Sequence, residues 1–202
     1  GNSDVLGVSL LGHGTRDTEK HRFTWLGQLT YARANGEEVE ENWSGTAKYD
    51  YFFRPRLYLA GAEELRHDKF KDLRVRSVTS VSLGYVFRRK PEMHLEAEIG
   101  GGALVERFYE AEDINELALR GAVNYKMPIG RKTDIINIFV IYVSGGTDRA
   151  QLVNTFKFEV EFTRRWGLEI VSIINHDSDP SFFATDTSDF QWTIGLAYSF
   201  LT

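Results

Sequence analysis

Hydrophobic and polar side chains alternate along almost the whole chain, which is the pattern of β-strands that have two different faces. In the segment FQWTIGLAYSF, residues 190–200, large apolar side chains occupy every second position, with small or polar residues between them. Successive side chains of a strand point to opposite faces, so one face of this segment is apolar and the other is small and polar. The same separation occurs in WSGTAKYDY (43–51) and HLEAEIGGGALVE (94–106).

This alternation predicts an all-β chain without helices, because no segment has helical periodicity. Most of the expected strands are about ten residues long or longer, and a tilted membrane strand needs roughly 9–11. We therefore expect one domain over residues 1–202, an antiparallel up-and-down transmembrane β-barrel. Eleven strands are visible in the pattern, over residues 4–16, 22–34, 43–52, 57–67, 74–87, 93–107, 116–127, 134–144, 151–163, 167–176 and 190–200.

On the apolar faces the aromatic residues gather near the strand ends, with small or aliphatic residues between them. Two aromatic belts are expected where amphipathic rings lie at the two membrane–water interfaces. A soluble β-sandwich has no reason to sort its aromatic residues by height. The expected belt residues are Trp25, Trp43, Tyr49, Tyr51, Tyr85, Tyr125, Trp192, Tyr198 and Phe200.

The opposite faces carry charged side chains that would be costly in a packed protein core. They are tolerable in the wet or salt-bridged lumen of a barrel. These charges either line a small pore or pair across the lumen and fill it, and the size expected of the barrel does not decide between the two. The expected network in the lumen consists of Lys48, Asp50, Glu96, Glu98, Arg120, Lys157, Glu159 and Glu161.

The connections between the strands alternate in length and charge. Short ones are mostly basic, as in RRKPE (88–92), and longer ones are mostly acidic, as in NGEEVEEN (35–42). Short turns of outer-membrane barrels face the periplasm and long loops face outward, and such barrels have even strand counts. Eleven strands would place Gly1 outside, so we expect a preceding strand and a twelve-stranded parent barrel. The alternative is that this pattern divides one strand into two or joins two strands into one, so that the true count is ten or twelve.

The composition narrows the chemistry further. There is no Cys, which excludes disulfides and thiolate metal sites, and the net charge of −5 argues against a nucleic-acid partner. No apolar run reaches about 18 residues, so no transmembrane helix is expected. His67 and Asp68 point to opposite faces as neighbours in a strand, and the serines lack a nucleophile elbow. We expect no catalytic residue, no metal site and no cofactor.

Several segments resemble a family of salt-induced outer-membrane proteins of Gram-negative bacteria, a domain-of-unknown-function family. The resemblance covers essentially the whole chain, and HDKFKDLRVR after a strand is its most specific part. It implies an outer-membrane barrel in contact with lipids and lipopolysaccharide and inserted by the barrel-assembly machinery, and it supplies no established activity. The resemblance rests on GNSD (1–4), TRDTEKHRF (15–23), NWSGTAKYDYFF (42–53), RPRLY (54–58), HDKFKDLRVR (67–76), SLGYVF (82–87) and LAYSF (196–200).

Three functions remain open at this point. The first is a structural or envelope-stress barrel of the bacterial outer membrane with at most a narrow polar pore. The second is a binding module whose acidic loops hold divalent cations, lipopolysaccharide or a partner protein. A barrel enzyme acting on lipid is the third and is disfavoured, because no catalytic motif is present. A soluble lipocalin-like barrel would need its apolar face inward, against the sorting of the aromatic residues.

Overall fold

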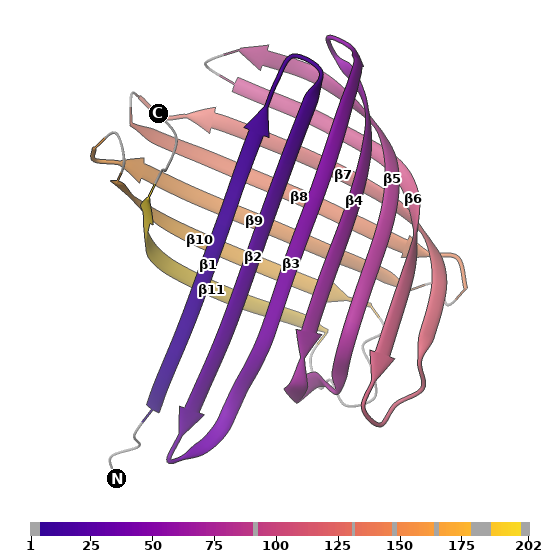
Figure 1. The fold of residues 1–202 in the computed structure, drawn as a ribbon, viewed down its shortest axis with the longest axis vertical. Coiled ribbons are helices and arrows are strands. Elements are labelled where there is room, and N and C mark those ends of the chain that lie inside the picture. The colour runs from indigo at the N-terminus through magenta and orange to yellow at the C-terminus, as the bar shows by residue number, and fades with distance from the viewer. Residues whose placement is uncertain are drawn as a thin grey trace.

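A computed structural model describes residues 5–90, 93–130, 132–146, 149–163, 166–178 and 187–198 of the chain. It confirms the all-β architecture, with eleven strands joined as antiparallel neighbours in sequence order (Figure 1). The strands are β1 (Val5–Asp17), β2 (His21–Ala34), β3 (Glu37–Arg54), β4 (Leu57–Asp68), β5 (Leu73–Lys90), β6 (Met93–Phe108), β7 (Ile114–Pro128), β8 (Thr133–Ser144), β9 (Ala150–Glu161), β10 (Trp166–Asp177) and β11 (Ser188–Tyr198).

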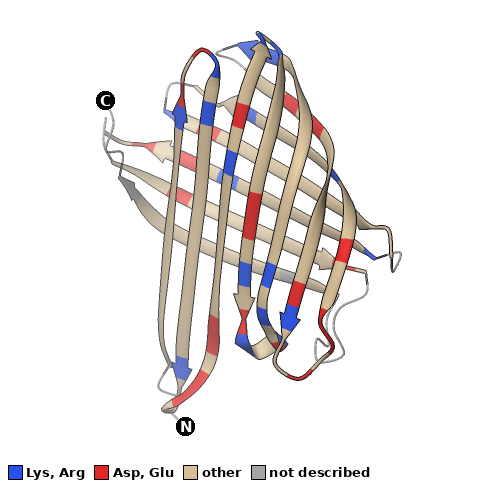
Figure 2. Cartoon of the chain, turned by 45° about the vertical axis from the view of Figure 1, so that its right-hand side comes forward, with Lys and Arg blue, Asp and Glu red and all other residues tan. Residues whose placement is uncertain are grey.

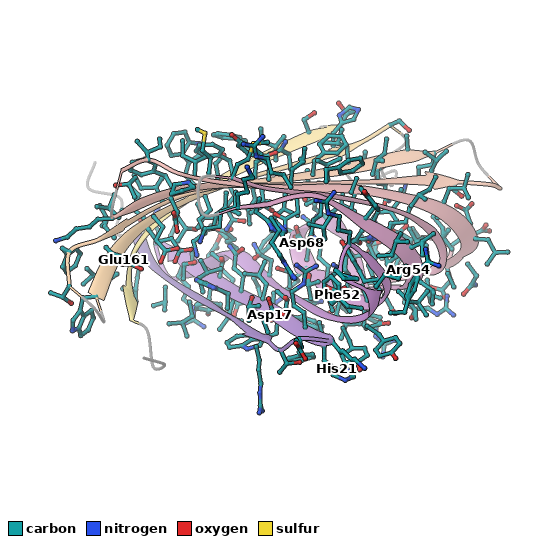
Figure 3. The ribbon with its side chains drawn as sticks, turned by 90° about the horizontal axis from the view of Figure 1, so that it is seen from above. Asp17, His21, Phe52, Arg54, Asp68 and Glu161 are labelled. Atoms are coloured by element: carbon teal, nitrogen blue, oxygen red, sulfur yellow. The ribbon has the colours of Figure 1, made fainter. Side chains whose placement is uncertain are left out.

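The sheet curls into a nearly closed barrel. In Figure 1 the strands β1 to β4 cross in front of β7 to β11, and from above the wall is flattened, with side chains both between its broad sides and outside them (Figure 3). Within the described residues β1 pairs only with β2 and β11 pairs only with β10, so a seam separates the two edge strands. The preceding strand of a twelve-stranded parent stays a prediction.

The two ends of the barrel differ. We call the end that holds the connections after β1, β3 and β5 the turn end, and the opposite end the loop end. At the loop end, Asn35 and Gly36 both have positive φ, as a two-residue hairpin of the primed type requires. A single 3-10 turn, η1 (Lys69–Lys71), joins β4 to β5 there and ends at Asp72 in the left-handed region. The Asp72 carboxylate accepts backbone N–H groups of Glu110 and Ala111, which ties two loops together.

Alternation of side chains gives the barrel an outer and an inner face. Shifts of register between strands, such as those at Phe52/Arg54 and Val86/Arg88, lie near strand ends, so the two faces stay consistent along the strand centres. Large apolar residues are exposed on the outer face, among them Ile99 at 73% and Leu117 at 76%. Among the described residues there is no helix long and apolar enough to cross a membrane.

The inner face of β3 to β8 contains two packed apolar clusters. Glycine makes room for one of them, because a Cβ at Gly84 would clash with the ring of Tyr58. In the run Gly100–Gly102, a Cβ at either end would clash with the backbone of β5, so β5 and β6 approach each other closely there. The clusters consist of Val78, Leu104, Ala118, Ala122, Val140 and Tyr142, and of Phe52, Tyr58, Ala60 and Val86.

Candidate functional site in the barrel interior

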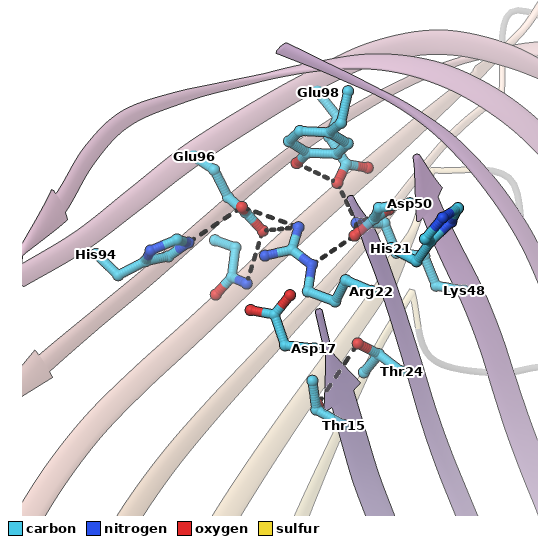
Figure 4. A network of polar contacts seen from close by, with 12 residues as sticks. Thr15, Asp17, His21, Arg22, Thr24, Lys48, Asp50, His94, Glu96 and Glu98 are labelled. Atoms are coloured by element: carbon cyan, nitrogen blue, oxygen red, sulfur yellow. Dashed lines mark hydrogen bonds and ion pairs between the residues drawn. The ribbon is translucent and has the colours of Figure 1, made fainter. Parts of the chain in front are cut away.

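A network of charged side chains crosses the interior near the turn end (Figure 4). The Arg22 guanidinium on β2 donates to Asp50 on β3 at 2.6 Å and reaches Glu96 on β6 at 3.0 Å. His94 and Asn124 also contact the Glu96 carboxylate, at 3.0 and 3.2 Å. Arg22 therefore pairs with the neighbouring strand β3 and also reaches across the lumen to β6, four strands away in the sheet.

Glu98 is the second centre of this turn-end network. It accepts the Tyr58 hydroxyl at 2.8 Å and the Arg120 guanidinium at 2.6 Å. Lys48 forms ion pairs with Glu98 and, at 2.9 Å, with Asp50. Three carboxylates, Asp50, Glu96 and Glu98, thus face three cations, Arg22, Lys48 and Arg120. Because removing one member would leave a buried charge uncompensated, this balance fixes the side chains in place.

A second network fills the interior towards the loop end. Arg149 donates to Glu106 at 2.6 Å and to Asp177 at 2.7 Å. Arg76 pairs with Glu106 at 3.6 Å and contacts the Gln151 amide oxygen, which joins β5 to β9 across the lumen. Between the two networks, the Tyr142 hydroxyl on β8 donates to Glu64 on β4 and accepts from Arg120. The part of the lumen bounded by β3 to β8 is therefore bridged from end to end.

A third, smaller cluster lies beside the seam. Lys157 on β9 donates to His13 Nε2 on β1 at 2.8 Å, and a carboxylate oxygen of Glu169 on β10 lies 3.4 Å from the same nitrogen. Lys157 also pairs with Glu169, and with Glu159 at 3.4 Å. The intervening strand β11 has Gly195 opposite Glu169, where an added Cβ would meet no atom within 4 Å. These contacts connect β1 to β9 and β10 without backbone pairing.

The eight residues expected in the lumen do not form one network. Five of them, Lys48, Asp50, Glu96, Glu98 and Arg120, lie together in the turn-end network. Lys157 and Glu159 belong to the cluster at the seam. Glu161 is exposed at the end of β9, where it lines a small hollow with Glu159, Lys132 and Asp134. Within the part of the chain that the structure describes, no group of three His, Asp or Glu side chains could hold a metal ion.

The outer face holds the aromatic residues expected in the belts. Trp43 lies towards the loop end and stacks on His67, whereas Tyr49 and Tyr51 lie towards the turn end, where Tyr49 stacks on His21 and Tyr51 contacts it with a tilted ring. Tyr125 is half-buried and its hydroxyl contacts Met127. The side chain of Tyr198 and the whole of Phe200 lie outside the described residues. Trp25, Trp43, Tyr49, Tyr51, Tyr85 and Trp192 are all exposed on this face.

Comparison with known proteins identifies the family of the chain and solved structures of similar fold. A family model described as "Protein of unknown function, DUF481" matches residues 1–200. The chain belongs to this family. The match confirms a family of unknown function and leaves the salt-induced outer-membrane description a prediction. No curated protein matches the chain.

Two solved porin structures resemble this DUF481 chain in fold. The NanC porin superposes with a TM-score of 0.55 at 9% identity, over 95% of this chain and 98% of the porin. The KdgM porin superposes with a TM-score of 0.48 at 10% identity, over 97% and 100% of the two chains. At such identity the likeness to NanC shows a shared barrel fold and no shared activity.

Sequence reasoning missed several members of the interior networks. Arg22 begins the expected strand 22–34 and has the same parity as the inward-facing Thr24 and Gln28, yet it was not among the residues expected in the lumen. Glu106 and Glu169 also lie within expected strands, and parity alone would have placed them inside. No local signal could have found the pairings themselves, because they join strands that are far apart in the chain.

Proposed function

We propose that this DUF481 chain is an outer-membrane β-barrel with a structural, envelope-stabilising role and at most a narrow polar pathway through its lumen. One observation carries the membrane assignment. The faces are inverted relative to a soluble barrel, with apolar side chains such as Leu6, Leu119 and Ile99 exposed outside and Asp50 and Glu96 buried inside. In water, so much apolar outer surface would be unfavourable, whereas in a bilayer it contacts lipid.

The two interior networks support a narrow pathway. Ion pairs and hydrogen bonds from opposite walls meet between β3 and β8, so a solute cannot follow that side without breaking them. We infer that the pathway runs along β9 to β11 and β1, where neutral inner-face side chains such as Thr193 and Gln191 lie near the cluster of Lys157, His13 and Glu169. A pathway there would admit small hydrated ions and exclude larger solutes.

The acidic hairpin at the loop end does not favour the alternative of cation binding. Figure 2 shows the acidic residues of this hairpin near the N-terminal end of β1. Lys69 already donates to Glu38 at 2.7 Å and to Glu41 at 2.9 Å. A divalent cation would have to displace this lysine. On the present proposal the outer face contacts lipid and lipopolysaccharide, and insertion uses the barrel-assembly machinery.

Refolding tests the proposal directly. The chain is refolded into lipid vesicles and into plain buffer, and heat-modifiable gel migration and protease resistance are compared. We expect a folded, protease-resistant form in vesicles only, followed by small, brief current steps in single-channel recording. A monomer that folds in plain buffer would contradict the membrane assignment. A flat trace at high voltage from the folded barrel would contradict the pathway and leave a purely structural barrel.

A further inference from the structure

One carboxylate lies on the wrong face of the barrel. Glu63 and Glu64 are neighbours in β4, so their side chains point to opposite faces. Glu64 faces inward and bonds to Tyr142, whereas Glu63 faces outward between Ala47 of β3 and Thr79 of β5. Among the described strand residues that face outward between the two aromatic levels, Glu63 alone is an Asp, Glu, Lys or Arg.

Glu63 lies about midway between the two aromatic levels of the outer face. The residue beside it on β3, Ala47, is midway between Trp43 and Tyr51, which belong to the two aromatic levels. The hydroxyls of Ser77 and Thr79, also on the outer face, donate to its two carboxylate oxygens at 2.6 and 2.5 Å. No cation of the described residues contacts Glu63, so its charge has hydrogen bonds and no counter-ion.

Such a group is expensive in hydrocarbon. An ionisable side chain on the lipid face of a barrel destabilises it most at the bilayer midplane, and ionisable residues within a membrane generally have a partner. The outer-face neighbours of Glu63 include Gly61, Ala47 and Ala103, whose small side chains project little from the barrel wall. Small residues allow a neighbouring backbone to approach closely within a bilayer.

We propose that the outer face of β3 to β6 around Glu63 is a docking site for a membrane-embedded protein segment that presents a Lys or Arg side chain at the bilayer midplane. The proposal rests on the membrane-spanning barrel and is independent of conduction. Charge complementarity selects the occupant, because lipid chains offer neither a cation nor a hydrogen-bond donor. A second copy of the chain is disfavoured, since no Lys or Arg of the described residues lies on its outer face between the aromatic levels.

The test uses the full chain folded in vesicles and a transmembrane peptide of about 20 apolar residues with one central Lys. Matched peptides carry Leu or Glu at the same position. The chain has 4 tryptophans, and energy transfer from them to a dansyl group on each peptide reports association. We expect the Lys peptide to associate about tenfold more tightly than the Leu peptide, since one polar contact in a bilayer contributes about 1–2 kcal/mol.

Two variants locate the effect. Glu63→Gln keeps the shape and removes the charge, and is expected to abolish the preference for the Lys peptide. Glu64→Gln removes the same charge on the inner face, and is expected to preserve that preference. Heat-modifiable migration verifies that each variant is folded and separates failure of the barrel from failure of docking.

Three results would overturn the proposal. The first is equal association of the Lys, Leu and Glu peptides with the folded wild-type chain. The second is an unchanged preference for the Lys peptide in Glu63→Gln. The third is self-association of the wild-type chain that excludes the Lys peptide and is lost in Glu63→Gln, because this would identify a second copy as the occupant.

Discussion

The interior of the barrel has two unlike halves. Between β2 and β8 it resembles the core of a soluble protein, with two apolar clusters and side chains such as Tyr58 and Glu96 that are almost fully buried. Along β9 to β11 and β1, fewer apolar side chains are buried on the inner face, and the side chain of His13 is 41% exposed, although Gln151 and Glu169 there are buried. Burial and paired charge stabilise the first half, and the proposed pathway runs along the second.

The largest expected effect is in the packed half. Arg22→Leu leaves Asp50 and Glu96 without their principal cation. Breaking a buried pair by removing one partner costs about 3–5 kcal/mol, so the variant should unfold at clearly lower denaturant concentration than the wild type in vesicles. Gln191→Leu, on the inner face of β11, is the control and should cost less, because its half-buried side chain carries no charge. Equal losses in the two variants would show that the halves do not differ.

A smaller loss is expected where glycine permits packing. Gly84→Ala places a Cβ against the ring of Tyr58, and the ring is wholly buried, so it can shift only by disturbing its neighbours. Overpacking of this kind costs about 1–3 kcal/mol. The same denaturant titration measures it, with Gly195→Ala as the control, because a Cβ there meets open space. A Gly84→Ala barrel with the free energy of unfolding of the wild type would mean that the side chains around Tyr58 are not tightly packed.

The architecture could be predicted from the sequence to a large extent. Alternation in segments such as 190–200 predicts strands close to the observed ones. The pattern is informative because a shift of one residue in the pairing would turn the apolar face of a strand inward. The interior pairings could not be predicted, since contacts such as Arg22 with Glu96 depend on how the sheet curls. Glu63 was overlooked although two adjacent glutamates in one strand require that one of them faces outward.

Loss of the bridging hydroxyl of Tyr142 should cost less than the loss of Arg22. Tyr142→Phe removes the bridge between Glu64 and Arg120 and leaves the ring in its apolar cluster. A buried hydrogen bond to a charged group is worth about 1.5–3 kcal/mol, and retained packing should place the loss at the lower limit. Denaturant titration again gives the value, and a change too small to resolve would show that water replaces the hydroxyl.

His13 should matter least for stability. His13→Ala removes a half-exposed contact to Lys157 and Glu169 at the seam, so we expect a loss below about 1 kcal/mol. The seam should nevertheless become more accessible, which faster protease cleavage within β1 would report. Unchanged cleavage would show that these side chains do not hold β1 in place.

The acidic hairpin at the loop end should respond to pH by a small amount. Hydrogen bonds from Lys69 lower the pKa of Glu38 below its ordinary value. A carboxyl whose folded pKa is depressed stabilises the folded state above its unfolded pKa, and this contribution is lost as the pH falls through the folded value. Chemical cross-linking of the Glu38 carboxyl in the hairpin to the Lys69 amine in η1 should therefore persist at neutral pH and decline only in acid. A decline on raising the pH from neutral to mildly alkaline would contradict this pairing.

The difference between the two halves is tested most directly by single-channel recording of the folded wild-type chain beside Gly195→Phe. Gly195 is on the inner face of β11 opposite Glu169, and a Cβ added there would meet no atom within 4 Å. We expect small current steps in the wild type and their loss in Gly195→Phe, with the same heat-modifiable migration and the same denaturant midpoint. Current steps that Gly195→Phe leaves unchanged, or a silent wild-type barrel, would contradict the proposed pathway.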